Sequence, residues 1–142
     1  MLVLDASVTL AWGLPDEQSE YAEAALTYLV ANGSRVPSVW VLEVLNGTLM
    51  AERAKRFTFD DAQDFLNQLR RLHRRRLILV SPVGPAEAFA DLAALAREHK
   101  LTAYDAAYLH LAQVQRLPLA SIDEALTAAA RKLGITVWTP PS

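Results

Sequence analysis

Short apolar segments alternate with longer amphipathic segments along the whole chain, and this alternation constrains the fold more than any other feature. Five short runs are expected to be strands, the second of them a strand or a turn: residues 2–4, 34–37, 77–80, 117–120 and 135–138. Helices are expected over residues 18–31, 38–55, 58–71, 85–100, 102–115 and 121–133. Because strands that alternate with helices form parallel sheets covered on both faces, the sequence predicts a three-layer α/β/α fold with a central, mostly parallel sheet.

Length and composition narrow the class of protein further. The 142 residues have the size of a single domain, 1–142, that can bury a core without disulfides. The absence of cysteine excludes iron–sulfur clusters, thiol nucleophiles and cysteine-type zinc sites, and it fits a cytoplasmic location. No signal peptide or membrane span is expected. The formal net charge of −2 excludes a protein that coats nucleic acid through its overall charge.

Four acidic residues stand in apolar surroundings, whereas most other acids lie on polar helix faces. Asp5 follows the first expected strand, and Asp123 follows the strand at 117–120. Glu43 and Asp105 lie in the early turns of helices that begin at the carboxyl ends of the strands. All four carboxylates are therefore expected at one edge of the sheet, where open α/β sheets bind ligands.

Most of these acids also have a simpler, structural explanation. Asp5 suits the cap of a following helix, Thr102–Asp105 has the spacing of a capping box, and Ser121–Glu124 forms a standard box with Asp123 in its first turn. Glu43 lies too deep in its helix to cap it, although it could be a surface acid. Capping explains the acids one at a time, but not why they converge on one edge.

A divalent cation accounts for that convergence. Carboxylates held close together repel one another and raise one another's pKa values. Oxygen ligands favour Mg²⁺ or Mn²⁺, and such ions promote phosphodiester hydrolysis by activating water and stabilising the displaced oxygen. The acids therefore predict a metal site with hydrolytic chemistry.

Four segments together resemble the PIN-domain ribonucleases of the VapC toxin type: residues 3–8 (VLDASV), 39–46 (VWVLEVLN), 101–109 (LTAYDAAYL) and 119–126 (LASIDEAL). The resemblance covers nearly the whole chain in order and spacing. It implies a PIN-like domain that cuts RNA with Mg²⁺ or Mn²⁺. It further implies that the catalytic and metal-binding residues are Asp5, Glu43, Asp105 and Asp123, and that the supporting polar positions are Ser7, Asn46 and Ser121.

The same resemblance implies partners. Family members bind a cognate antitoxin protein whose tail masks the metal site, and they tend to form homodimers. An apolar groove for such a partner is expected from residues of two helices, namely Val41, Leu42, Leu45 and Leu49 with Leu26, Leu29 and Val30. The predicted function is that of an endoribonuclease toxin of a toxin–antitoxin pair.

The pattern of acids fits two other protein families less well. A haloacid-dehalogenase-type phosphatase needs a second Asp where this chain has Ser7, and a response-regulator receiver needs an Asp after its third strand, where residues 77–83 carry no acid. A PIN nuclease that processes RNA without an antitoxin remains an alternative. So does a non-catalytic PIN module that binds RNA or protein, although that role does not require four intact carboxylates.

One dense basic run stands out against the balanced overall charge. It contains five arginines that are candidates for RNA phosphate contacts: Arg70, Arg71, Arg74, Arg75 and Arg76. The alternative is a helix C-terminus that carries favourable cations. The three histidines, His73, His99 and His110, are expected to be structural.

Overall fold

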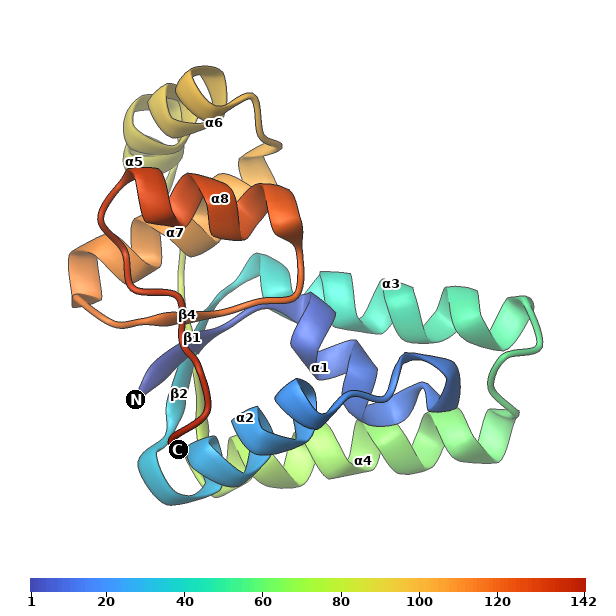
Figure 1. The fold of residues 1–142 in the computed structure, drawn as a ribbon. Helices are drawn as coiled ribbons and strands as arrows, with labels where there is room; N and C mark the ends of the chain where they lie inside the picture. Colours follow the sequence, from blue (N-terminus) through green and yellow to red (C-terminus); the bar gives the residue numbers. More distant parts are fainter.

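The computed structural model describes residues 1–142 and contains a four-stranded sheet in which all neighbouring strands are parallel (Figure 1). In chain order the strands are β1 (Leu2–Leu4), β2 (Ser34–Pro37), β3 (Ile78–Ser81) and β4 (Leu119–Ala120). Across the sheet their order is β3-β2-β1-β4, with Leu2 beside Ser34 and Ser34 beside Ile78. The predicted parallel sheet is confirmed.

The fifth predicted strand, at residues 135–138, is reduced to a single parallel bridge between Leu119 and Val137. Leu119 N donates to Thr136 O at 2.9 Å, and Trp138 N donates to Leu119 O at 2.8 Å. The pairing ends there because β4 has only two residues and because Pro140, which lacks an N–H, follows closely.

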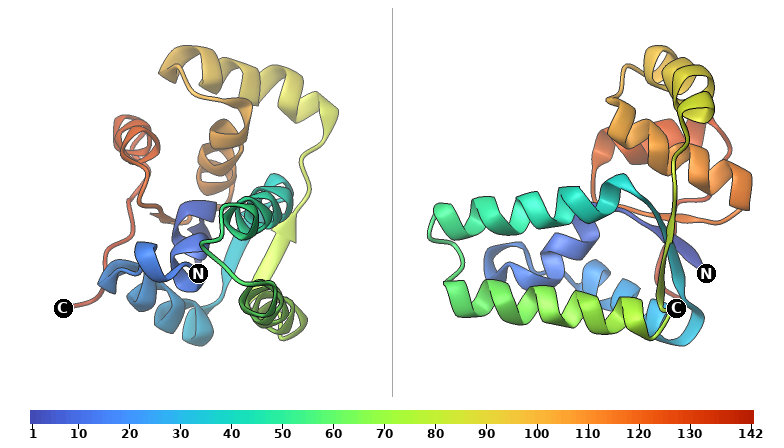
Figure 2. Two further views of the ribbon diagram at one scale, coloured as in Figure 1. Left: turned by 90° about the vertical axis from the view of Figure 1, so that its right-hand side faces the viewer. Right: turned by 180° about the vertical axis from the view of Figure 1, so that it is seen from behind.

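Helices and short helical turns make up the rest of the fold. They are α1 (Ala6–Gly13), η1 (Pro15–Glu17), α2 (Glu20–Asn32), α3 (Val39–Arg53), α4 (Phe59–Arg74), α5 (Pro85–Glu87), η2 (Ala88–Leu92), α6 (Ala93–His99), α7 (Ala103–Gln115) and α8 (Glu124–Lys132). Helices α1 to α4 lie on one side of the sheet and α5 to α8 on the other (Figures 1 and 2). The predicted three-layer α/β/α architecture is confirmed.

Three local features differ from what the sequence predicts. Helix α1 was missed because it is short and nearly all apolar, so no polar face marks it. The helix predicted over 85–100 contains a π-helical turn, η2, between α5 and α6. The sequence predicts Ser38 as the cap of the helix over 38–55, but its side chain makes no capping bond to α3. Thr58 does cap α4, by accepting a bond from Asp61 N.

The buried apolar residues form one cluster of 35 residues that runs from Leu2 to Trp138. All three residues of β1 are fully buried, because the central strand is covered on both faces. None of the helices combines the length and the apolar character that a membrane crossing requires.

The direction of the chain decides where the site residues meet. All four strands end at the same edge, and α1, α3 and α8 begin just beyond it. Helix α7 leads into β4 and so runs back across the sheet, with its N-terminus at that same edge (Figure 1). We call this edge the carboxyl edge and the opposite one the amino edge.

Candidate active site

Asp5 is the most buried of the four candidate acids, with 5% of its surface exposed. It directly follows β1 and precedes α1, but its carboxylate makes no capping bond to that helix. The capping explanation therefore does not account for Asp5. A carboxylate in this position is costly to bury unless other groups compensate for the lost water.

Two hydroxyls compensate by donating to the same oxygen of Asp5. Ser7 Oγ lies 2.6 Å and Ser121 Oγ 2.8 Å from Asp5 Oδ2. Each hydroxyl in turn accepts a backbone N–H: Ile122 N donates to Ser7 Oγ at 3.1 Å, and Asp123 N donates to Ser121 Oγ at 3.0 Å. Because an ionised carboxylate can only accept, both hydroxyl protons are directed at Asp5, while the serine oxygens accept the two amide N–H groups.

Glu43 enters the site from the second turn of α3 and is half-buried. Its Oε1 accepts a hydrogen bond of 2.7 Å from the hydroxyl of Tyr108, which lies on α7. Asn46, one turn further along α3, is exposed, and its amide contacts Met50 Sδ at 3.4 Å. As its side chain lies, Asn46 makes no hydrogen bond to Glu43.

Asp105 lies in the first turn of α7 and is half-buried. The predicted cap at Thr102 forms, because Thr102 Oγ1 accepts a bond of 3.1 Å from Asp105 N. That bond uses the backbone N–H of Asp105 rather than its carboxylate; the Thr102 hydroxyl also lowers the pKa of that carboxyl in part. The capping role and a role in the site are therefore compatible for this residue.

Asp123 is exposed and is itself the N-cap of α8, since its Oδ1 accepts a bond of 2.9 Å from Leu126 N. The prediction that Ser121 caps this helix was wrong, because the Ser121 hydroxyl is committed to Asp5. One oxygen of Asp123 is used by the cap and the other is not.

The pKa values indicate that the acids sense one another. Burial, assisted by the charge of Asp123, raises the pKa of Asp5 despite the hydrogen bonds from the two serines. Burial also raises the pKa of Glu43, to which the charges of Asp5 and Asp105 add. The pKa of Asp105 is raised by burial and by Asp123 and Asp5. Carboxylates from four separate elements thus share one electrostatic field.

The donor set fits a hard divalent cation, because it consists of carboxylate oxygens supported by hydroxyls. As the side chains lie, no three His, Asp or Glu groups are close enough to hold one ion together. Since hydrogen bonds hold Asp5 and Glu43 in place, ligation by three of the acids requires the carboxylate of Asp105 or Asp123 to move toward them, against the repulsion described above. A cation would relieve that repulsion.

The basic run lies far from these acids along the strands. Arg70, Arg71 and Arg74 are in the last turns of α4, and Arg75 and Arg76 follow that helix just before β3 begins. Since β3 begins beside the start of β2, the run lies at the amino edge. It does not line the carboxylates, and its contact with RNA stays a prediction.

An apolar groove with a volume of about 400 Å³ lies between α3, α4 and β3. It is lined by Trp40, Val41, Val44, Leu45, Leu66, Leu69, Arg70, His73 and Val80. The expected groove was therefore right for Val41 and Leu45 but wrong in its second helix. Leu29 of α2 is fully buried in the core, and α4 supplies the other wall.

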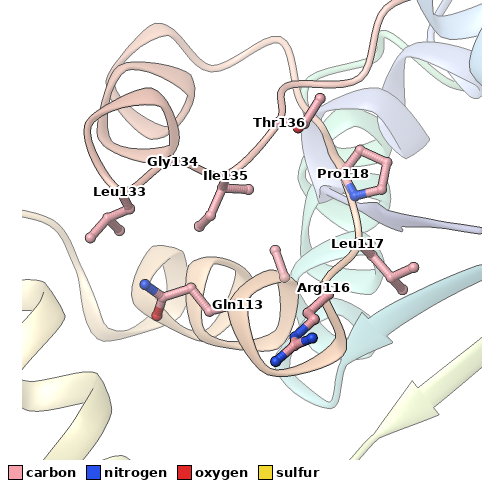
Figure 3. A pocket seen from close by; sticks show the side chains of 9 residues that line it. Gln113, Arg116, Leu117, Pro118, Leu133, Gly134, Ile135 and Thr136 are labelled. Atoms are coloured by element: carbon pink, nitrogen blue, oxygen red, sulfur yellow. The ribbon is translucent and has the colours of Figure 1, made fainter.

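A second cavity, of about 350 Å³, lies between the end of α7 and the segment after α8 (Figure 3). Its walls include Gln113, Arg116 and Thr136. Pro118, which also lines it, precedes β4, whereas Asp123 follows that strand. This cavity therefore belongs to the amino edge and is separate from the acids.

Sequence reasoning missed Tyr108 as a neighbour of Glu43. The available signal was its placement on an otherwise apolar face of the helix that carries Asp105, because a buried phenol requires an acceptor. The pattern could not say which acceptor, since Glu43 lies 65 positions away.

The chain resembles known proteins in both sequence and fold. Residues 2–132 match the model of the PIN domain family. The chain is 32% identical over 125 residues to Ribonuclease VapC3 of Pyrobaculum aerophilum. The aligned residues are 88% of this chain and 91% of the relative.

Two solved structures share the fold. A protein from Pyrobaculum aerophilum superposes with a TM-score of 0.66 at 22% identity, covering 90% of this chain and 83% of its own. A toxin–antitoxin complex from Klebsiella pneumoniae contains a chain that superposes with a TM-score of 0.64 at 18% identity, covering 100% of this chain and 99% of its own.

Proposed function

This chain belongs to the PIN-domain family, and on that premise we propose that it is a divalent-metal-dependent endoribonuclease that acts as the toxin of a toxin–antitoxin pair. The observation that carries the proposal is the buried Asp5 carboxylate, which two serine hydroxyls hold at the edge where three further acids converge. The similarity to Ribonuclease VapC3 over most of both chains supports RNA as the substrate. We take residues 1–142 to act as one domain.

The residues proposed to hold Mg²⁺ or Mn²⁺ are Asp5, Glu43, Asp105 and Asp123. When bound, such an ion supplies Lewis acidity for the charge that builds up on a phosphodiester during hydrolysis. Asp5 is the fixed reference point, because its Oδ2 is hydrogen-bonded on two sides. Ser7 and Ser121 act by orienting that carboxylate.

Glu43 and Asp105 are suited to accept the proton of the attacking water. Both are half-buried, and burial raises the pKa of each carboxyl. These directions hold for the metal-free site; a bound cation lowers the pKa of its ligands, so the carboxylate oxygen that accepts the proton is one that does not ligate the ion. Asp123 is exposed at the mouth of the site, where it adds negative charge.

We assign the antitoxin to the groove between α3 and α4. Its apolar lining suits the apolar face of a helix, and Arg70 at its wall favours a partner with an acidic residue beside that face. A neighbouring gene for a small DNA-binding protein would support this role over RNA processing without an antitoxin. The homodimer and the cytoplasmic location stay predictions.

The decisive experiment is cleavage of total RNA by the purified protein with and without Mg²⁺ or Mn²⁺, followed by mapping of the cut ends. We expect discrete internal cuts that require the ion and that disappear in Asp5→Asn. A folded wild-type protein that binds RNA but leaves it intact with either ion would instead support the non-catalytic module.

A further inference from the structure

Tyr108 is the bulkiest of the fully buried side chains, with 0% of its surface exposed. It lies on α7, one turn after Asp105. Its hydroxyl donates to Glu43 Oε1 at 2.7 Å and thereby joins α7 to α3 across the carboxyl edge. Because the Tyr108 side chain has no access to water, this bond restricts the positions of both the phenol and the Glu43 carboxylate.

We propose that Tyr108 is a positioning residue that holds the Glu43 carboxylate in the orientation needed for metal binding and RNA cleavage. The proposal rests on the proposed function, and it assigns to the phenol no contact with RNA or with the ion. By occupying Oε1, the phenol leaves Oε2 of Glu43 as the oxygen available to the site.

The direction of the hydrogen bond is fixed. Burial together with the charges of Asp5 and Glu43 raises the pKa of the phenol above its ordinary value, so Tyr108 keeps its proton at every pH at which the protein is assayed. The Glu43 carboxylate is consequently always offered a donor at the same place. An oriented acceptor is worth more for ligation than a freely rotating one, because its rotamer entropy is already lost.

A second buried contact holds the same part of α3. Trp40, three residues before Glu43, donates from Nε1 to Thr9 Oγ1 at 3.0 Å, and Thr9 Oγ1 donates to the backbone oxygen of Asp5 at 3.3 Å. The first turns of α3 are thus tied both to α7 and to the residue at the centre of the site. The Trp40–Thr9–Asp5 bonds and the Tyr108–Glu43 bond therefore hold Glu43 at a fixed position relative to Asp5.

A purely structural role makes a different prediction. A buried phenol needs an acceptor, and on that account Glu43 would merely satisfy Tyr108. Removing the hydroxyl would then cost stability without changing how the site binds metal. The two accounts differ in the metal dependence of the protein.

The first test is Tyr108→Phe, which removes the hydroxyl and keeps the ring. We expect kcat for RNA cleavage to fall about 10–100-fold with KM for RNA unchanged. We also expect a rise of about 10–100-fold in the Mn²⁺ concentration that gives half of the thermal stabilisation of the RNA-free protein. The control is Thr48→Val, which removes a buried hydroxyl from α3 that donates to Val44 O at 2.8 Å. It should lower stability and leave kcat and the Mn²⁺ midpoint unchanged.

A double-mutant cycle tests whether Tyr108 acts through Glu43. Once Glu43→Gln has removed the charge that is being positioned, adding Tyr108→Phe should move the Mn²⁺ midpoint by less than about twofold. Two independent effects that simply multiply would overturn the proposal. So would a Tyr108→Phe protein that matches Thr48→Val in kcat and in Mn²⁺ midpoint.

If Tyr108→Phe does not fold, the proposal can be tested by a measurement that leaves Tyr108 in place. The protein is labelled with 3-fluorotyrosine at its four tyrosines, and the signals of Tyr21, Tyr28 and Tyr104 are assigned by Phe variants. We expect the remaining fluorine resonance, that of Tyr108, to shift with Mg²⁺ and to reach half of its full shift at the Mg²⁺ concentration that gives half of the thermal stabilisation. A resonance that does not move while Mg²⁺ stabilises the protein contradicts the proposal.

These outcomes separate the inference from the proposed function. Absence of cleavage by the wild-type protein would reject the nuclease, yet the metal midpoint and the fluorine signal would still test Tyr108. Cleavage that requires Asp5 but does not respond to Tyr108→Phe would reject only the positioning role.

Discussion

The hydroxyl of Ser121 donates to Oδ2 of Asp5 at 2.8 Å, although 116 positions separate the two residues in the chain. The bond ties the end of β4 to the end of β1, which are neighbouring parallel strands. Ser121 is 5% exposed, as is Asp5, so water cannot replace the bond. This relationship makes Ser121 part of the candidate site and removes it from its predicted role as a helix cap.

Ser121→Ala should therefore separate stability from activity. We expect a loss of about 1 kcal/mol in the free energy of unfolding, typical of a buried hydrogen bond, and a fall of about tenfold in RNA cleavage. Ser34→Ala is the matched control, since its buried hydroxyl donates to Leu77 O at 2.8 Å at the amino edge. Ser34→Ala should lose similar stability and keep full activity; equal activity in the two variants would contradict the role of Ser121.

Asp5→Asn should uncouple the protein from metal. Removing the charge relieves the cost of burying a carboxylate near other acids, so the metal-free protein should be as stable as wild type or more stable. Millimolar Mg²⁺ or Mn²⁺ should raise the melting temperature of wild type through preferential binding to the folded state and should scarcely affect the variant. Thermal shift and RNA cleavage measure the two effects. A wild-type melting temperature that responds to neither ion would exclude the metal site.

The metal-free protein should become less stable as the pH rises. Asp5, Glu43 and Asp105 have raised pKa values in the folded state, chiefly through burial. The folded state therefore binds protons more tightly than the unfolded chain. The resulting stability is complete below the unfolded pKa, about 4, and is lost as the pH rises through the folded values.

Chemical denaturation between about pH 4 and 7 checks this sign, and Asp5→Asn should make the fall in stability shallower. Asp16→Asn is a control that should leave the pH dependence in this range unchanged: the Arg56 hydrogen bond lowers the pKa of that exposed carboxyl, so its contribution is lost only below about pH 4. Its effect should be small, since solvent screens the pair. An Asp5→Asn profile parallel to that of wild type would contradict the assignment.

Asp123 should respond differently to two substitutions because it both caps α8 and borders the site. Asn is as good an N-cap as Asp, so Asp123→Asn should fold with nearly wild-type stability while cleavage falls. Asp123→Ala should lose cleavage and, in addition, about 1 kcal/mol of stability through the missing cap. Denaturation and cleavage of a labelled RNA distinguish the two losses. Full activity in Asp123→Asn would leave this residue only its capping role.

The arginines at the amino edge should affect binding but not chemistry. Replacing Arg74, Arg75 and Arg76 with Ala should weaken RNA binding. The plot of log affinity against log salt concentration should become less steep by about 2. Because these residues lie at the opposite edge from the acids, kcat at saturating RNA should not change. An unchanged slope would assign the run to the electrostatics of the helix end.

Much of this fold followed from local patterns. Residues 2–4 and 77–80 are short apolar runs that end at a polar residue, Asp5 and Ser81, which is enough to place buried strands. The cap at Thr102 was also predicted from local spacing and forms as expected. Helix α1 was not predicted because it is short and carries no charged residue, so its sequence has no periodic polar face.

The sequence by itself determined which acids stand out, Asp5, Glu43, Asp105 and Asp123, and that a parallel sheet brings them to one edge. Only the tertiary structure decided how each is held. Ser121 serves Asp5 while Asp123 takes over the cap, and Tyr108 holds Glu43. The tertiary structure also separated the basic run from the acids by placing it at the other end of the strands. Local spacing fixes caps and faces because their partners are three or four residues away, whereas partners 65 or 116 positions apart meet only through packing.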